Sequence, residues 1–219
     1  RWGVSFLIGE DLLFDTFGKP GVLLSNMRKF NINPAQIKHI FLSHDDWDHI
    51  SGLWGLIQAR SYVTVYVCPG FKQEIKDRIA SFGVRVVEAE ALTVIKENVF
   101  SSGQMQSTCS DRVIFEQVLV LKSSRNLSII TGCAHPGIIN IIDTVERQFP
   151  QGRVYALAGG FHLKDYTHDV TMHIIGVLKD KGIRRIVPTH CTGKWATKMI
   201  RYEFGYRCLK AVEGSSIEL

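Results

Sequence analysis

No stretch of the sequence approaches the roughly 18 consecutive apolar residues that a membrane-spanning helix needs, so an integral membrane protein is excluded. Low-complexity linkers, internal repeats and sharp breaks in composition are also missing. Hydrophobic residues make up 45% of the chain and charged residues 21%, which excludes a disordered protein. The 219 residues therefore predict a single domain over residues 1–219. Because the chain begins at Arg1 within an apolar segment, we expect part of an N-terminal strand to be missing from it.

Clustered positive charge is scarce too. Lys and Arg number 26 against 21 Asp and Glu, a net charge of +5, but the positive charge is scattered, with Arg28-Lys29 and Arg184-Arg185 as the adjacent basic pairs. Neither a nucleic-acid nor a membrane partner is therefore expected. The five cysteines are widely spaced without a CxxC pair, which predicts reduced thiols in a cytoplasmic protein rather than a disulfide framework. They are Cys68, Cys109, Cys133, Cys191 and Cys208.

Apolar strands along the chain repeatedly end in loops rich in His, Asp and Gly, after which a helix begins. An apolar hairpin is expected over 4–14, and a meander over 92–121 with a polar loop at 101–110. The other expected strands are 37–42, 62–67, 84–87, 127–131, 154–158 and 185–187, and the expected helices are 21–30, 50–59, 71–82, 138–149, 170–181 and 194–204. Strand ends converge in α/β architectures, so these loops can meet at one site. The mixed order predicts sheets packed together with helices outside.

The densest group of polar side chains is the run Ser-His-Asp-Asp-Trp-Asp-His at residues 43–49. His44, Asp46 and Asp48 can project to one side of an extended loop, with His49 at the start of a helix. Two imidazoles and two carboxylates this close are sufficient to begin two cation sites. The alternative is a solvated acidic turn in which Asp48 caps the helix. Two further histidines that follow apolar strands supply the missing ligands of a dinuclear centre; they are His135 and His190.

These segments resemble the metallo-β-lactamase superfamily. Residues 44–49 resemble its HxHxDH signature with Asp46 in place of the second histidine, and residues 14–18 resemble its FDTG turn with Phe17 inserted. The segments TGCAHPGI, GGFHL and PTHCTG, which begin at residues 131, 159 and 188, are similar to one branch. That branch contains the dihydropterin ribofuranosyl-aminobenzene phosphate synthase of methanopterin biosynthesis and many metal-dependent hydrolases. The resemblance implies an α/β fold of the α+β type, a four-layer αββα sandwich with a metal site at one edge of the two sheets.

The resemblance also implies which residues hold metal ions. The two ligand sets are His44, Asp46 and His135 for one ion, and Asp48, His49 and His190 for the other. Two imidazoles and one carboxylate suit catalytic zinc and also non-haem iron, so we expect two divalent ions, zinc first, with iron or manganese as alternatives. The superfamily's bridging aspartate, expected near residues 159–162, is absent. Asp46 supplies a negative charge that can compensate for it.

The implied chemistry is hydrolysis by a metal-activated water. Asp48 would orient that water, and His162 is the candidate for a substrate contact, a proton donor to the leaving group or an extra ligand. The alternative for His162 is a hydrogen bond to the backbone of its glycine turn. A net-positive centre favours a small anionic substrate that bears a phosphate or a carboxylate. Two rival functions are a pterin-pathway synthase acting on a ribosyl phosphate and a non-catalytic metal- or ligand-binding module.

Cysteine and tryptophan residues near the expected ligands allow more than one interpretation. A thiolate at Cys133 or Cys191 would suit zinc, but we interpret both as small buried fillers. Trp54 is expected in the core, whereas Trp47 and Trp195 could form an aromatic wall for a flat substrate such as a pterin.

Overall fold

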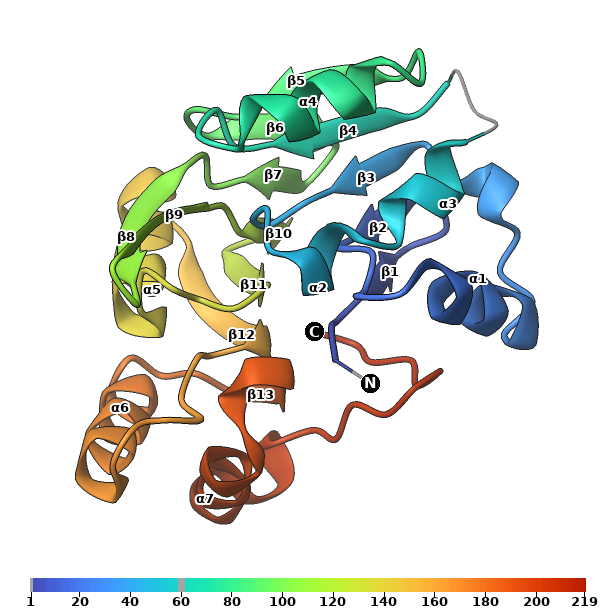
Figure 1. The fold of residues 1–219 in the computed structure, drawn as a ribbon. Coiled ribbons are helices and arrows are strands. Elements are labelled where there is room, and N and C mark those ends of the chain that lie inside the picture. The colour runs from blue at the N-terminus through green and yellow to red at the C-terminus, as the bar shows by residue number, and fades with distance from the viewer. Residues whose placement is uncertain (1, 59–61) are drawn as a thin grey trace.

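The computed structural model describes residues 2–58 and 62–219, and its strands form two main β-sheets (Figure 1). The first sheet has the order β1-β2-β3-β4-β5. Its strands are β1 (Phe6–Ile8), β2 (Leu12–Phe14), β3 (His39–Phe41), β4 (Thr64–Val67) and β5 (Arg85–Glu88). β1 and β2 form an antiparallel hairpin, while β2 to β5 run parallel to their neighbours. The carboxyl ends of β2, β3 and β4 therefore point to the same edge.

The second sheet has the order β13-β12-β11-β10-β7-β6. Its strands are β6 (Thr93–Lys96), β7 (Val99–Ser101), β10 (Leu119–Ser123), β11 (Asn126–Thr131), β12 (Arg153–Gly160) and β13 (Arg185–Thr189). β11, β12 and β13 are parallel, and β6, β7 and β10 form the expected antiparallel meander. A separate two-stranded sheet pairs β8 (Met105–Cys109) with β9 (Arg112–Glu116).

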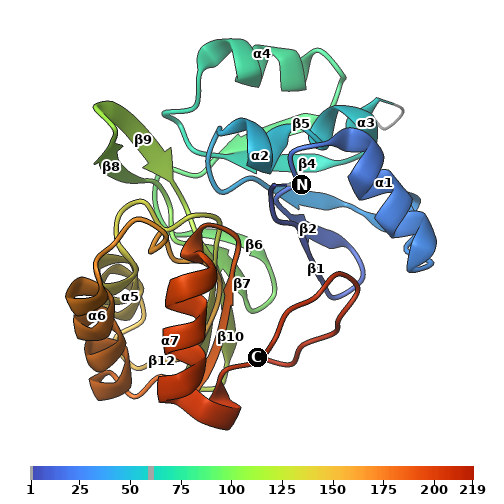
Figure 2. The ribbon, with the colours of Figure 1, turned by 60° about the horizontal axis from the view of Figure 1, so that its bottom comes forward.

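Helices cover the outer faces of both sheets. The α-helices are α1 (Pro20–Lys29), α2 (Trp47–Ile50), α3 (Leu53–Ile57), α4 (Gln73–Ala80), α5 (Ile138–Gln148), α6 (His168–Asp180) and α7 (Lys194–Phe204), and the short 3₁₀ turns are η1 (Pro34–Gln36), η2 (His190–Thr192) and η3 (Gly205–Arg207). Figure 2 shows α5, α6 and α7 on one outer side and α1, α3 and α4 on the other. The expected four-layer αββα sandwich is confirmed. Within the described residues, no helix combines the length and apolar character needed to cross a membrane.

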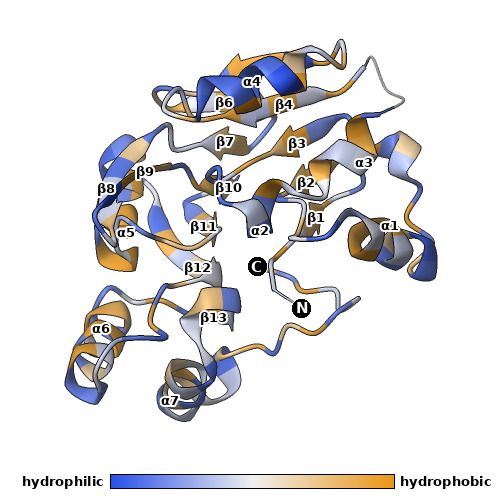
Figure 3. Cartoon of the chain, in the orientation of Figure 1, coloured by the Kyte–Doolittle hydropathy of each residue, from blue (hydrophilic) through white to orange (hydrophobic). Residues whose placement is uncertain are grey.

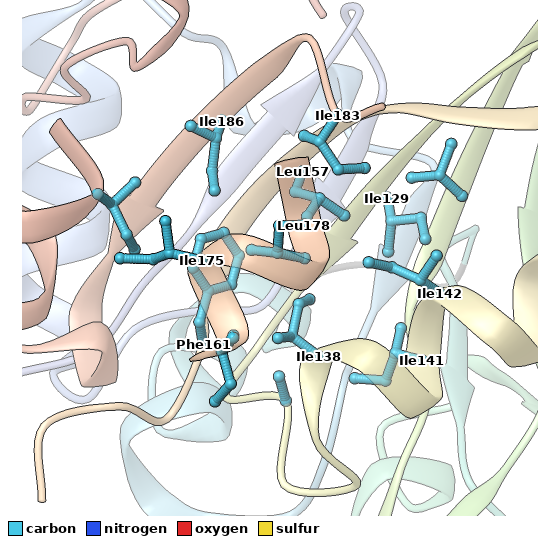
Figure 4. Packing of buried hydrophobic residues seen from close by; sticks show 14 of the residues in the cluster. Ile129, Ile138, Ile141, Ile142, Leu157, Phe161, Ile175, Leu178, Ile183 and Ile186 are labelled. Carbon is cyan, nitrogen blue, oxygen red and sulfur yellow. The ribbon is translucent and has the colours of Figure 1, made fainter. Parts of the chain in front are cut away.

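Alternation along the strands builds the layers, because successive side chains point to opposite faces of a sheet. On β3, Ile40 packs in the cluster beneath α1, α3 and α4, whereas Phe41 packs between the two sheets. Leu13 and Phe14 on β2 divide in the same way. A third apolar cluster joins the second sheet to α5, α6 and α7 (Figure 4). In Figure 3, β3 and β4 carry much hydrophobic colour, while α4 is largely hydrophilic.

Two expected elements differ in the structure. The polar stretch 101–110 contains strand β8 rather than a loop throughout, because Ser110 and Asp111 both take a positive φ and close a tight hairpin with β9. The expected helix 50–59 is two short helices, α2 and α3, and its last residue lies outside the described part. The break falls at Gly52, where a Cβ atom would lie 1.8 Å from the carbonyl oxygen of Thr16. The chain there is pressed against the loop after β2.

Candidate metal centre

Loops that follow strand ends meet at one edge of the sandwich. The segment 43–49 follows β3, residues 132–135 follow β11, and His190 follows β13. The carboxyl ends of parallel strands gather such loops at one place. The sequence separations between these segments are large, yet their side chains form one cluster.

The six side chains expected to hold metal ions lie in two compact groups. The candidate ligand atoms of His44, Asp46 and His135 lie within 4.8 Å of one another. Those of Asp48, His49 and His190 do the same. These groups coincide with the two ligand sets that the sequence resemblance implies, while metal binding itself stays a prediction.

The first group leaves one imidazole nitrogen facing the centre without a partner. Ser43 Oγ donates its hydrogen to Asp15 Oδ2 at 2.8 Å, so it must accept from His44 Nδ1, also at 2.8 Å. In the neutral ring the lone pair of His44 Nε2 is then free, and this fully buried atom, 3.6 Å from Asp46 Oδ2, has no hydrogen-bond partner among the described residues. A buried nitrogen of this kind is costly unless something binds it. A divalent cation fits the atom and its two neighbours in the group.

In the second group, ring nitrogens of two histidines lie close together. A cation bound by both histidines would lie between these nitrogens. His49 Nε2 lies 3.2 Å from His190 Nε2, and Asp48 Oδ2 lies 3.0 Å from His190 Nε2. His49 Nδ1 donates to Asp15 Oδ2 at 2.6 Å, so this ring is oriented from behind by a buried carboxylate. Carboxylates that hold a ligating histidine in this way are typical of metal centres. The donor set therefore fits a second divalent cation.

Glu116 is a positioning residue that the sequence analysis missed. Its fully buried carboxylate accepts hydrogen bonds from the backbone N–H of Cys133, Ala134 and His135, at 3.0, 2.8 and 2.8 Å. It also accepts from His135 Nδ1 at 2.8 Å, which turns Nε2 of that ring toward the centre. No motif marks this glutamate, because it lies in β9 and reaches its partners across the fold. Asp15 was within reach of sequence analysis, since it belongs to the segment that resembles the FDTG turn.

Neighbouring charged groups shift the pKa values of several residues in the site. Burial would raise the pKa of Glu116, but its hydrogen bond with His135 and the nearby His44 hold it far below the usual range. Burial likewise opposes ionisation of Asp46, yet interactions with His44 and Arg112 keep its pKa well below normal. For His49 burial would lower the pKa, and the Asp15 carboxylate outweighs it and raises the pKa to about 9.

His162 lies beside the first group rather than within it. Its ring centroid is 4.6 Å from that of His135, and its Nε2 is 3.7 Å from Cys109 Sγ, at the end of β8. Its buried Nδ1 has no hydrogen-bond partner in the described part of the chain, so the expected alternative of a backbone-bonded ring is not what the structure shows. Interaction with the Cys191 sulfur raises the pKa of His162 above its ordinary value.

The surroundings of the centre are partly aromatic and basic. Trp47 and Trp195 are more than half exposed, while Trp54 packs against an apolar cluster as expected. Trp2, which the sequence analysis did not single out, has its ring centroid 4.6 Å from that of His190. Arg112, near the turn of the β8–β9 hairpin, donates to Asp46 Oδ1 at 2.6 Å. A guanidinium and an indole therefore lie beside the two ligand groups.

Comparison with known proteins shows which proteins are similar to this chain in sequence and fold. The family model of the metallo-beta-lactamase superfamily matches residues 3–85. A solved structure of a metal-dependent hydrolase of the β-lactamase superfamily has a TM-score of 0.82 and 25% identity, covering 100% of this chain and 92% of that one. Human tRNase Z, short form, has a TM-score of 0.56 at 16% identity over 85% of this chain and 84% of that one, which shows the fold alone. The chain therefore matches the metallo-β-lactamase superfamily model over residues 3–85 and shares the fold of a solved member of that superfamily over its whole length.

One curated relative is similar over most of its length. It is the 7,8-dihydropterin-6-methyl-4-(beta-D-ribofuranosyl)-aminobenzene-5'-phosphate synthase of Methanocaldococcus jannaschii. It is 28% identical over 248 residues, which cover 92% of this chain and 84% of that protein. This similarity agrees with the branch that the sequence motifs resemble.

Removing the negative charge of Glu116 should weaken metal binding without removing a ligand. In Glu116→Gln the amide nitrogen cannot accept a hydrogen bond, so His135 or its loop loses an acceptor. We expect metal affinity to fall by roughly 10–100-fold, measured by competition with a chromophoric chelator. Glu97→Gln, at an exposed position, is the matched control. Equal affinities for the two variants would contradict the positioning role.

The His49–Asp15 pair should make the stability of the metal-free protein depend on pH. A histidine whose pKa is raised from 6.5 to about 9 stabilises the fold fully below pH 6.5, and this contribution is lost as the pH rises through about 9. We expect the free energy of unfolding of chelator-treated protein, measured in urea, to fall across this window. Asp15→Asn should lack most of this decline. A decline of the same size in the variant would count against the pair.

Proposed function

We propose that the protein is a dinuclear metal-dependent hydrolase that acts on a small anionic substrate. The observation that supports this most directly is the unpartnered, buried Nε2 of His44, which faces two other candidate ligands. Zinc is the first candidate for both ions because imidazole and carboxylate are its usual ligands, with iron or manganese as alternatives. Bound divalent ions supply Lewis acidity and a water that ionises near neutral pH.

Residues of the chain then have separate roles in the proposed reaction. Asp48 Oδ2 lies 3.0 Å from His190 Nε2 and 3.7 Å from His49 Nε2, so the carboxylate stands inside the centre and can orient the attacking water. His162 stands at the side of the centre, with a pKa raised by Cys191, which suits a proton donor to the leaving group.

The substrate class follows from the charges around the centre. Arg112 offers a guanidinium whose side chain is 56% exposed, which leaves its remaining donors available to an anion. Lys164 Nζ lies 5.8 Å from the Trp2 ring centroid, so a second cation stands beside the indole near His190. These groups favour a phosphate- or carboxylate-bearing small molecule. Nucleic acid and membrane partners are not part of the proposal, and a cytoplasmic location is proposed because all five cysteines are free.

A second candidate is a pterin-pathway synthase that forms a bond to a ribosyl phosphate. The observation that favours it is the similarity to the synthase of Methanocaldococcus jannaschii over 92% of this chain. The aromatic ring of Trp2 beside His190 would suit a flat pterin. Release of phosphate or alcohol from simple esters would support the hydrolase, whereas turnover that requires both a pterin and a phosphorylated ribose would support the synthase. A binding module without turnover predicts bound metal and no activity with either set.

Metal content is the first test of the proposed centre. We expect about two equivalents of transition metal in the wild-type protein, as in other two-metal sites, measured by elemental analysis. His49→Ala and Asp46→Ala each remove one ligand from a different group, so each should lower the metal content. His168→Ala removes a histidine whose side chain is 62% exposed and serves as the control. Wild-type protein that takes up no metal after reconstitution would overturn the proposal.

The role of His162 can be tested by changing the leaving group. If His162 donates a proton, His162→Ala should lower kcat by roughly 10²–10⁴-fold for a phosphodiester with an alkyl leaving group. The nitrophenolate released from a nitrophenyl ester is a weak base and leaves without protonation. The kcat for that ester should therefore change little. Initial rates for the two esters, measured with fully metal-loaded protein, give the comparison. An equal loss for both esters would exclude proton donation.

A further inference from the structure

We propose that Cys133 is a sulfur ligand of the dinuclear centre, placed between its two halves, where it replaces the superfamily's bridging carboxylate. This inference rests on the proposed metal centre and adds a ligand to it. It also replaces the interpretation of Cys133 as a small buried filler.

The position of the sulfur carries the proposal. Cys133 Sγ lies 3.4 Å from His49 Nε2. Its sulfur is within 4.8 Å of the ligand atoms of His44 and His49, and also of those of His190 and Cys191. His44 belongs to the first ligand group, while His49 and His190 belong to the second. The thiol, on a residue only 6% exposed, therefore stands next to both groups and to the unpartnered His44 Nε2.

The packing of Cys133 differs from that of a cysteine that fills apolar space. Cys68 is buried within the apolar cluster of the first sheet and α1, α3 and α4. Cys133 belongs to none of the three apolar clusters of the described residues, although its neighbour Ala134 does. Ligand nitrogens of His44, His49 and His190 and the sulfur of Cys191 lie within 4.8 Å of its sulfur instead. Interaction with the Cys191 sulfur and burial raise the pKa of this thiol, so a bound cation would have to displace its proton, as metal ions do at cysteine ligands. The resulting thiolate is a soft ligand for zinc or iron.

The backbone around Cys133 is fixed in a way that aims the side chain. At Gly132 a Cβ atom would lie 2.1 Å from Ser43 Oγ, so only glycine lets the end of β11 approach the loop after β3 this closely. Glu116 accepts from the N–H of Cys133 and from the next two backbone N–H groups. The backbone that carries the sulfur is thus held by the same residue that orients His135.

Two of the positions near which the bridging aspartate is expected have no room for a side chain. At Gly160 a Cβ atom would lie 2.4 Å from the carbonyl oxygen of Gly132 and 2.5 Å from Cys191 Sγ. At Gly159, where φ is +123°, it would lie 2.1 Å from the carbonyl oxygen of Thr131. At these two positions the backbone and the Cys191 sulfur leave no room for a carboxylate, and His162 stands at the last position of the expected range. The sulfur of Cys133, just after β11, is an additional donor that stands next to both ligand groups.

A sulfur ligand has a consequence for the choice of metal. Thiolates favour zinc, cobalt and iron, whereas manganese and magnesium favour oxygen ligands. We therefore infer that zinc or iron, rather than manganese, occupies the centre.

Cobalt substitution tests the proposal with a readout that does not depend on activity. A cysteine thiolate bound to Co²⁺ gives a near-ultraviolet sulfur-to-metal charge-transfer band, and bound Co²⁺ of any ligand set gives visible d–d bands. Protein reconstituted with Co²⁺ is expected to show both. Cys133→Ser should lose the charge-transfer band and keep the d–d bands. Cys191→Ser and Cys109→Ser are the matched controls, because their sulfurs also lie near candidate ligands, and both should keep the band.

The outcomes separate the sulfur ligand from the metal centre. Visible d–d bands without a charge-transfer band in the wild type would overturn the sulfur ligand and leave the centre standing. Loss of the band in Cys191→Ser but not in Cys133→Ser would also overturn it. A wild-type protein that binds no Co²⁺ would overturn both proposals.

Zinc measurements cover the case in which the serine variant does not fold. Zinc-edge X-ray absorption of the wild-type protein should show a sulfur neighbour, and its absence would overturn the proposal. In a folded Cys133→Ser variant, competition titration should show zinc affinity lowered by at least the roughly 10–100-fold that loss of an outer-shell partner costs. Manganese affinity should change much less, and equal losses for the two metals would contradict a soft ligand.

Discussion

The structure depends on the need to orient buried imidazoles so that their free nitrogens converge. An uncharged imidazole has one donor and one acceptor nitrogen, and burial without partners is costly. Asp15 and Glu116 meet this need from outside the cluster: Asp15 holds His49 directly and His44 through Ser43, while Glu116 holds His135. These two carboxylates come from different sheets: Asp15 follows β2 of the first sheet, and Glu116 lies in β9 of the two-stranded sheet. The hydrogen bonds of this cluster therefore also join the two halves of the sandwich.

The strands, the helices and the loops that follow strand ends could be predicted from the sequence, because their patterns depend on residues close together along the chain. The helix over residues 194–204 and the ligand groups around His44 and His49 follow from such local patterns together with the resemblance to a known superfamily. The role of Glu116 could not be predicted from the sequence, because it consists of hydrogen bonds to a loop 17 to 19 positions away along the chain. The hairpin of β8 and β9 was missed because Ser110 and Asp111 close it without the glycine that usually marks such a turn.

The two halves of the centre have different surroundings. Asp46 is paired with Arg112 and partly open to solvent, whereas His49 and Asp15 are fully enclosed. In the proposed reaction an incoming anion would compete with Asp46 for the Arg112 guanidinium. His49, in the second group, is held instead by the buried Asp15 carboxylate. The proposed centre would therefore bind an anion at its first group while the second group keeps its geometry.

The tight contact at Gly160 also limits how this protein can change over evolutionary time. An aspartate introduced there alone would meet the carbonyl oxygen of Gly132 and the sulfur of Cys191 at distances that no side chain tolerates. An aspartate at Gly159 would meet the carbonyl oxygen of Thr131 in the same way. A carboxylate at either glycine would therefore require the neighbouring strand ends to move apart. The close packing of these strand ends and the absence of a side chain at the two glycines depend on each other.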